Sequence, residues 1–539
     1  MAYDYSQTRN TKKTPQSEAI PGREQDMAEN NAGGYTFVID KWTRLQRFLI
    51  LGSEGGTYYV NKEDHTKQNV DNSIACIKED PKRVLDLIVE ISTEGRAPKN
   101  DQAIFMLALL LTEGSNDVKK DVVAKFPEVC RIGTHLFTFV HYIDTMRSWG
   151  RTIRDAVANW YSMDPGKLEY QLIKYKGRTV EGTKNQWTHR DVLRSAHVKP
   201  KTELHNMLFK YAVKGEASNE LKLIKAYEEL HSDESESAEN VNKLIKEYKI
   251  PHDAWPTNLK NSISTWRQAL PDLPFTALMR NLNKLTALGI LKEGAFDELE
   301  LVTNKLTDAE YIKKSRVHPI NMLIAMKTYN QGHGYKGDLS WVPVQKITDA
   351  LEAGFYLSFK NVEPTGKKML LGIDVSGSMS WSSSAIGILT AAEVAACMAM
   401  VTAKTESKYA VMGFAHEFRN LNITPNLSLN EVLRITSMHN FGGTDCALPM
   451  LWAKQQNLDF DVFVIYTDSE TWYGDVHPTQ ALQSYRKRKH SVEEAKLIVV
   501  GVEATNFSIA DPNDAGMLDI CGFDSATPQI ISEFSKGKI

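Results

Sequence analysis

The chain has 539 residues, of which 42% are hydrophobic and 24% are charged, and its formal net charge is −3. This composition is typical of a soluble globular protein and leaves room for two to four domains. Five scattered cysteines without a CxxC pair argue against a disulfide framework and favour free thiols in a reducing compartment. The sequence begins without the apolar core of a secretory signal, and its longest apolar run, residues 103–111, is too short to span a bilayer. We therefore expect an intracellular protein, in the cytoplasm or also in the nucleus.

The small net charge hides an uneven distribution along the chain. Residues 361–539 contain 14 basic and 20 acidic side chains, whereas residues 119–215 contain 18 basic and nine acidic ones, together with five histidines. Local charge of this kind indicates the partners of a protein rather than its fold.

The N-terminal half of the chain shows helix patterns after a short polar segment. We expect residues 1–34 to form a polar arm that is at most partly ordered. In residues 35–360, apolar side chains recur at helical spacing, and proline or glycine breaks follow about every 15–25 residues. This rhythm predicts short antiparallel helix pairs in a HEAT-like array, which curves and presents a concave or annular surface. The pattern leaves open whether the array forms an open superhelix or a closed ring.

Residues 361–539 alternate between strand and helix patterns after a linker that contains Pro364 and Gly366. This alternation predicts a doubly wound α/β domain. We expect strands at 369–374, 409–414, 462–468 and 497–501, and helices at 391–404, after Ser428, up to 456, near 479–489 and near 527–534.

The first of these strands ends in an Asp-x-Ser-x-Ser motif formed by Asp374, Ser376 and Ser378. Ligands of an open α/β sheet bind at the carboxyl ends of its strands, so one carboxylate and two hydroxyls converge where a ligand would bind. These hard oxygen groups suit Mg²⁺ or Mn²⁺. A Gly-Gly-Thr turn ending at Thr444 and a buried strand ending at Asp468 follow in the sequence. The alternative role for the two serines is helix N-capping beside an ordinary turn.

The order of these three motifs resembles the metal-ion-dependent adhesion site of von Willebrand factor A domains. The resemblance implies that one divalent ion is surrounded by Asp374, Ser376, Ser378, Thr444 and Asp468. It also implies that one coordination position stays open for a carboxylate from a protein partner.

The basic stretch contains a short predicted helix that starts at Thr188 with a capping-box-like Asp191 and stops at Pro200. Arg190, Arg194 and His197 lie at i, i+4 and i+7 and form one polar stripe, whereas Val192, Leu193 and Ala196 would face the core. Guanidinium and imidazole groups beside aromatic residues suit phosphates and stacked bases. A solvated helix face is the alternative. We predict an RNA-binding surface made of Arg131, Lys174, Lys176, Arg178, His189, Arg190, Arg194, His197, Lys199 and Lys201.

The two halves together resemble the TROVE family of Ro autoantigens. The resemblance rests on the segments Trp187 to Arg194 and His197 to Pro200, followed by an A domain with Asp374-Val375-Ser376-Gly377-Ser378. It implies a ring of HEAT-like helices closed by the A domain. It further implies that Y RNAs bind on the outer basic surface, and that misfolded noncoding RNAs, such as 5S rRNA precursors, thread a single-stranded end through a central hole. The weight given to His189 comes from the His-Arg-Asp motif, because its spacing alone puts it toward the apolar side of the helix.

An enzymatic function has little support in the sequence. The chain has no Gly-x-x-x-x-Gly-Lys-Ser/Thr loop, no Gly-x-Ser-x-Gly elbow and no His-Glu-x-x-His motif. Ser376 stands where phosphotransfer on Asp374 would require an acidic residue. We therefore expect a monomeric RNA-binding protein without a membrane partner. The alternative is a metal-dependent protein-interaction adaptor, and the steep salt dependence of phosphate contacts separates the two.

Overall fold

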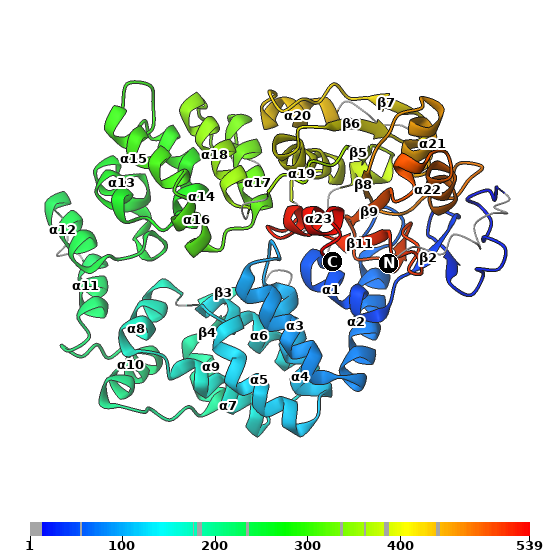
Figure 1. Ribbon diagram of the computed structural model, residues 1–539. Helices are drawn as coiled ribbons and strands as arrows, with labels where there is room; N and C mark the ends of the chain where they lie inside the picture. Colours follow the sequence, from blue (N-terminus) through cyan, green and yellow to red (C-terminus); the bar gives the residue numbers. More distant parts are fainter. Residues whose placement is uncertain are drawn as a thin grey trace.

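The computed structural model describes residues 13–53, 56–175, 177–179, 186–232, 237–334, 338–359, 363–381, 387–437 and 442–539. Helices follow one another up to residue 357, and an α/β domain follows them (Figure 1). None of the described helices is long and apolar enough to cross a bilayer. The architecture confirms the predicted fold class, a helical repeat region followed by a doubly wound domain.

The helical region is built from short helices that pack against their neighbours in the sequence. Side-chain caps begin many of them, as at Asp40, Asn61 and Ser115. Its α-helices in the described residues are α1 (Lys41–Leu51), α2 (Lys62–Glu79), α3 (Pro81–Glu94), α4 (Asp101–Glu113), α5 (Asn116–Val129), α6 (Gly133–Met146), α7 (Arg151–Tyr161), α8 (Pro165–Lys174), α9 (His189–Ala196), α10 (Glu203–Lys214), α11 (Lys222–Leu230), α12 (Ala238–Tyr248), α13 (Ile263–Ala269), α14 (Phe275–Ala287), α15 (Phe296–Leu306), α16 (Ala309–Ser315), α17 (Pro319–Asn330) and α18 (Gln345–Leu357). A short antiparallel ribbon, β3 (Gly177–Thr179) and β4 (Gln186–Thr188), precedes α9.

The two ends of this helical region meet, so the array is a closed ring (Figure 1). His318, which caps α17, donates its Nε2 proton to the carbonyl oxygen of Arg96 after α3, at 3.1 Å. Asn321 donates to the carbonyl oxygen of Pro98 at 3.3 Å. The Arg96 guanidinium in turn pairs with the buried Asp524 of the α/β domain at 2.7 Å. These contacts settle the choice between ring and open superhelix that the sequence pattern left open.

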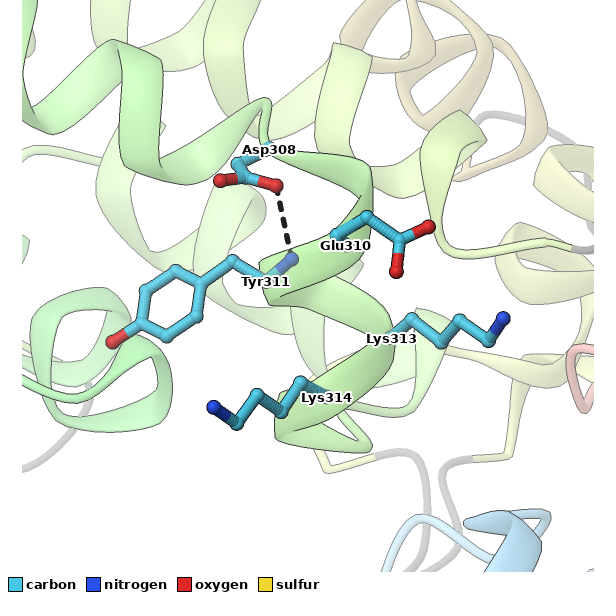
Figure 2. A pocket seen from close by; sticks show the side chains of 5 residues that line it. All are labelled: Asp308, Glu310, Tyr311, Lys313 and Lys314. Carbon is cyan, nitrogen blue, oxygen red and sulfur yellow. Dashed lines mark hydrogen bonds between the residues drawn. The ribbon is translucent and has the colours of Figure 1, made fainter.

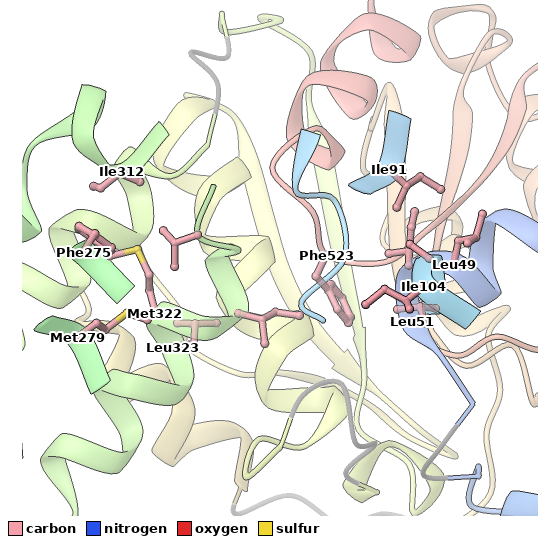
Figure 3. Close-up of a cluster of buried hydrophobic side chains, with 14 of the residues drawn as sticks. Leu49, Leu51, Ile91, Ile104, Phe275, Met279, Ile312, Met322, Leu323 and Phe523 are labelled. Carbon is pink, nitrogen blue, oxygen red and sulfur yellow. The ribbon is translucent and has the colours of Figure 1, made fainter. Parts of the chain in front are cut away.

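Apolar side chains fill the seam where the ring closes (Figure 3). Phe523, which follows the last strand of the α/β domain, lies between side chains of α1 and α4 on one side and of α17 on the other. The labelled neighbours include Leu51, Ile104 and Leu323, and all of them are buried in one continuous core. The seam is therefore continuous with the apolar core, and its burial stabilises the ring.

The α/β domain is centred on a six-stranded sheet with strand order β11-β9-β8-β5-β6-β7. All neighbouring strands are parallel except β7, which is antiparallel to β6. Every residue of β5 and β8 is buried, as expected for parallel strands covered on both faces. The strands are β5 (Met369–Asp374), β6 (Tyr409–Phe414), β7 (Phe418–Asn420), β8 (Val462–Thr467), β9 (Lys496–Gly501) and β11 (Met517–Cys521), and the helices are α19 (Ala391–Thr405), α20 (Leu429–Ser437), α21 (Leu448–Gln455), α22 (Pro478–Arg486) and α23 (Thr527–Ser535).

The N-terminal arm differs from the expectation. Residues 13–38 pack on the α/β domain, where β2 (Tyr35–Val38) pairs with both β1 (Met27–Glu29) and β10 (Phe507–Ser508). Arg23 makes a bidentate ion pair with Asp511 at 2.6 and 2.7 Å. Residues 13–34 of the arm, which we expected to be at most partly ordered, take up a defined structure because their polar side chains bind to a domain distant in the sequence. Residues 1–12 lie outside the described residues.

Candidate functional site

The predicted metal ligands come together because β5 and β8 are adjacent parallel strands. Ile373 of β5 is in register with Tyr466 of β8. Asp374, at the end of β5, and Asp468, directly after β8, therefore lie at the same edge of the sheet. The Ser376–Ser378 turn comes directly after β5, and its second serine opens a short 3-10 helix, η6 (Ser378–Ser380). Asp374, Ser376, Ser378, Thr444 and Asp468 are all buried.

Hydrogen bonds fix the orientation of these groups. Asp374 Oδ1 accepts from the backbone N–H of Ser376 at 2.9 Å, and its Oδ2 accepts from the Thr467 hydroxyl at 2.7 Å. The Ser376 and Ser378 hydroxyl oxygens lie 3.2 Å apart. Asp468 Oδ1 accepts from the backbone N–H of Glu470 at 3.0 Å. The turn thus places both carboxylates and both hydroxyls at fixed positions before any ligand binds.

The electrostatics of this edge favour a bound cation. Burial and the carboxylate of Asp468 raise the pKa of Asp374 to about 7, and burial raises the pKa of Asp468. The Oδ2 atom of Asp468 is buried without a hydrogen-bond partner in the described structure. A divalent cation would neutralise the two carboxylates and give this oxygen a partner. Among the described residues no group of three or more His, Cys, Asp or Glu side chains is placed to hold a metal, so hydroxyl ligands have to complete the shell. The donor set of hard oxygens fits Mg²⁺ or Mn²⁺.

Two residues that the sequence analysis did not single out lie beside this site. Burial and the neighbouring charge of Asp468 raise the pKa of Glu470 to about 8, and Glu470 accepts hydrogen bonds from Asn31 in the N-terminal arm. Burial raises the pKa of the Tyr59 phenol, between α1 and α2; the charge of Asp468 raises it further and a hydrogen bond with Ser378 opposes the shift. Glu470 stands two residues after Asp468 and could have been found from that motif, whereas no pattern around Tyr59 links it to the A domain.

The predicted helix in the basic stretch is α9, and its start has the expected form. Thr188 Oγ1 accepts from the backbone N–H of Asp191 at 3.2 Å, and Asp191 Oδ2 accepts from the backbone N–H of Thr188 at 3.1 Å. Val192, Leu193 and Ala196 are buried, as predicted. Arg190 and Arg194 are exposed, and within the described ranges neither of them forms an ion pair. The helix therefore presents two exposed guanidinium groups, and its buried face anchors it to the core.

His189 lies in the core and not on the surface. Its ring is 3% exposed and packs against Phe137 and Trp160, while its Nδ1 atom lies 2.8 Å from the Tyr161 hydroxyl. Burial lowers the pKa of His189 to about 3, so the ring is neutral. The structure therefore does not expose this imidazole on the predicted RNA-binding surface, because at the start of α9 the apolar side of the helix faces inward. His189 instead positions the first turn that carries Arg190.

The remaining predicted RNA-binding residues differ in their exposure and in their partners. Arg131 is half-buried and donates to Ser92 and to the carbonyl oxygen of Glu128, so its guanidinium holds α3 and α5 together. Lys174 lies beside Asp253 at 3.6 Å and over the ring of Tyr175. Lys176 and the side chain of Arg178 lie outside the described residues. His197, Lys199 and Lys201 are exposed after the end of α9. His197 is in the left-handed region, with φ of 51°, and ends the helix before Pro200.

A hollow of about 510 Å³ lies along α16, away from both of these sites. It is lined by Asp308, Glu310, Tyr311, Lys313 and Lys314, and Figure 2 shows that these side chains point in different directions. Asp308 caps the helix by accepting from the backbone N–H of Tyr311 at 3.0 Å. No predicted site residue lines this hollow, and its two acidic residues lie toward the start of α16 while its two lysines lie toward the end.

The fold and the site together define a class of protein, a closed helical ring joined to a von Willebrand factor A-type domain. The family model of the TROVE domain matches residues 28–328, and that of the Ro60 vWA domain matches residues 368–535. The chain therefore belongs to the TROVE family of Ro60 proteins.

Several relatives are similar over nearly their whole length. The chain is 38% identical over 532 residues to the RNA-binding protein RO60 of Deinococcus radiodurans, covering 97% of this chain and 98% of that one. It is 37% identical over 593 residues to the RNA-binding protein RO60 of Caenorhabditis elegans, covering 95% and 90%. Its fold matches the crystal structure of the Deinococcus radiodurans RO (RSR) protein with a TM-score of 0.68, at 38% identity, over 93% of this chain and all of that one.

Proposed function

We propose that this protein binds RNA through the basic face of its helical ring and has no enzymatic activity. The observation that carries the proposal is the exposed pair Arg190 and Arg194 on α9, whose opposite face is buried. Phosphate contacts by guanidinium groups supply most of the affinity for RNA. The printed names of two relatives that match nearly the whole chain, both RNA-binding proteins, support the same function.

The more detailed proposal concerns which RNAs are bound. Small Y RNAs bind on the outer basic surface, and misfolded noncoding RNAs, including 5S rRNA precursors, enter through a single-stranded end in the centre of the ring. This division serves RNA quality control by a monomer in the cytoplasm, with the nucleus as a second location. The closure of the helical region into a ring supports the second part of this proposal, since sequence-specific recognition of RNA targets unpaired ends, loops and bulges.

The test is a binding titration with two fluorescently labelled hairpin RNAs of equal stem. One is blunt, and the other carries a single-stranded 3′ tail. Fluorescence anisotropy is measured from 50 to about 300 mM salt. We expect affinity to fall steeply with salt for both RNAs and the tailed hairpin to bind more tightly. Equal and weak binding that is insensitive to salt would overturn the proposal.

We further propose that Asp374, Ser376, Ser378, Thr444 and Asp468 hold Mg²⁺ or Mn²⁺. The buried Asp468 Oδ2 atom without a protein partner supports this assignment. The ion supplies a coordination position for a carboxylate of a protein partner. The turn after β5 orients the serine hydroxyls, and Thr467 holds Asp374 in place.

A second candidate function, a metal-dependent protein-interaction adaptor, is favoured by exposed aromatic rings beside this site. The backbone N–H groups of Trp472 and Tyr473 donate to the carbonyl oxygen of Thr444 at 3.1 and 3.0 Å, and that of Trp381 donates to Ser378 at 3.1 Å. Trp381 and Trp472 are each 40% exposed, and Tyr473 is 49% exposed. Exposed aromatic side chains are enriched in protein interfaces. The adaptor function predicts that Trp472→Ala weakens capture of a protein partner while RNA affinity stays unchanged; an equal loss of RNA affinity would contradict it.

A further inference from the structure

A cavity of about 220 Å³ lies between α8, α12, α13 and the start of α14, apart from the basic face of α9. Its lining includes Tyr170, Lys174, Lys246, Lys249, His252 and Trp255. The short 3-10 helix η3 (His252–Ala254) forms one side and contacts α8. The cavity is thus assembled from segments separated by up to about a hundred residues in the sequence, and the ring curvature brings them together (Figure 1).

The charge of the lining favours an anion. Three lysines, Lys174, Lys246 and Lys249, line the cavity together with one carboxylate, that of Asp272, and a second carboxylate, Asp253, lies 3.6 Å from Lys174, so the positive charge is in excess by one. Lys249 lies 3.7 Å from Asp272, and Lys246 is exposed without an ion pair among the described residues. The first turn of α14, behind Pro274, has no side-chain cap, so the positive end of this helix also faces the cavity rim.

Aromatic rings form the walls of the same cavity. Trp255 is fixed because it is 3% exposed, donates its indole N–H to the carbonyl oxygen of Ile250 at 3.0 Å, and packs edge-on against Trp266. His252 packs beside Trp266 at a centroid distance of 5.6 Å. Tyr170 is only half-buried, and the ammonium group of Lys174 lies 5.6 Å from its ring centroid. A half-exposed ring beside cations offers a surface on which a planar base can stack.

The volume limits the ligand. It is smaller than the roughly 300–1,000 Å³ of pockets that hold a drug-sized molecule, so the cavity takes one small planar group and leaves an attached charge at the rim. A nucleotide has this form, with an aromatic base for the walls and a phosphate for the lysines.

We infer that this cavity binds a single nucleotide of a single-stranded RNA tail, with the base against Tyr170 and the phosphate held by Lys174, Lys246 and Lys249. The inference rests on the proposed RNA binding and adds a second contact, specific to single strands, to the duplex contacts of α9. A base in a duplex is stacked and paired and cannot enter, so the cavity distinguishes a tailed RNA from a blunt one.

The experiment uses the full chain and the blunt and tailed hairpins described above. Two variants alter the cavity in different ways. Lys246→Ala with Lys249→Ala removes charge from the rim, and Ala277→Phe fills the cavity without changing charge. We expect either variant to lower affinity for the tailed hairpin about tenfold and to leave affinity for the blunt hairpin unchanged. The matched control is Lys222→Ala with Lys225→Ala, two exposed lysines of α11 at the same spacing that do not line the cavity, for which both affinities should stay within about twofold.

Each outcome decides between distinct explanations. If the lysine double variant binds both hairpins as the wild type does, the inference is wrong while the proposed function stands, and because these lysines are exposed this variant keeps the fold. If the wild type binds neither hairpin, the proposed function fails and the inference with it. Uridine monophosphate is titrated separately. Suppose that uridine monophosphate binds the wild type but not Ala277→Phe, while Ala277→Phe binds the tailed hairpin as tightly as the wild type does. The cavity is then a site for a free nucleotide, and the inference is overturned.

Discussion

The proposed metal site and the basic face of α9 hold charged groups in opposite ways. The proposed metal site buries two carboxylates, and burial raises the pKa of both; hydrogen bonds orient them at one edge of the sheet. The α9 face leaves Arg190 and Arg194 in solvent and buries only the apolar side of the helix. A buried site of this kind is specific for one small ion, and substitution of any one ligand impairs it. An exposed basic face binds a large anion through several separate phosphate contacts, each of which is weakened by salt.

Removing a metal ligand is expected to have the largest effect. Asp374→Ala should abolish Mg²⁺ binding, because it removes one of two carboxylates from a buried site that hydroxyls alone cannot replace. Calorimetric titration with Mg²⁺ measures this loss. Asp459→Ala, which removes a carboxylate that precedes β8 and pairs with Arg488, is the control and should leave the titration unchanged. Retained Mg²⁺ binding in Asp374→Ala would show that the ion sits elsewhere.

The next largest effect, on the free energy of unfolding, is expected where α1 contacts the α/β domain. Arg47 of α1 is 1% exposed, makes a bidentate pair with Asp519 at 2.7 Å, and donates to the carbonyl oxygens of Thr505 and Phe507. Arg47→Ala removes the charged partner of Asp519, which then keeps only the hydrogen bond from the Ser508 hydroxyl, and should cost about 3–5 kcal/mol. The free energy of the first urea transition measures it. Arg83→Ala, which removes an exposed guanidinium that lies over Trp42, should cost less than about 1 kcal/mol. Equal costs for the two variants would mean that the seam contributes little.

His189, on the buried side of α9, should make the stability of the protein depend on pH, whereas the arginines on the exposed side should not. The pKa of His189 is lowered from 6.5 to about 3 in the folded protein. The unfolded chain therefore binds a proton below pH 6.5 that the folded chain does not, and stability is lost as the pH falls. Between pH 7 and 5 this amounts to about 2 kcal/mol. Thermal unfolding of wild type and His189→Gln should show the steeper decline in the wild type; parallel declines would contradict the buried neutral ring.

The sequence predicts much of the α/β domain because its signals are local. Uninterrupted apolar runs mark β5 and β8, so the sequence places Asp374 and Asp468 at the ends of the correct strands. In the helical region, a capping box marks the start of α9 and places Arg190 on that helix. The short strands β7, β10 and β11 were missed, since few residues separate them from loops and their pairing depends on partners elsewhere in the chain.

The failures share a cause, which is contact between segments distant in sequence. The N-terminal arm is polar by composition and yet ordered, because Asp511 and Glu470 supply partners from the other end of the chain. Arg131 was assigned to RNA from its charge, whereas Ser92 and the Glu128 carbonyl occupy it. His189 was assigned from a motif although its helical spacing already pointed inward. For the arm and for Arg131 no local pattern reveals the partner, whereas for His189 the helical spacing indicates the buried side of α9.

We propose that RNA affinity resides on the helical ring and not at the proposed metal site, and three proteins compared in one titration distinguish the two sites. The blunt hairpin is titrated by fluorescence anisotropy across a salt series against wild type, Asp374→Ala and Arg190→Ala with Arg194→Ala. The account predicts that the arginine variant loses about tenfold in affinity, or about 1.4 kcal/mol, and that its salt slope falls by about 1 to 2, while Asp374→Ala binds as the wild type does. A large loss in Asp374→Ala, together with unchanged binding by the arginine variant, would contradict it and place the RNA on the A domain.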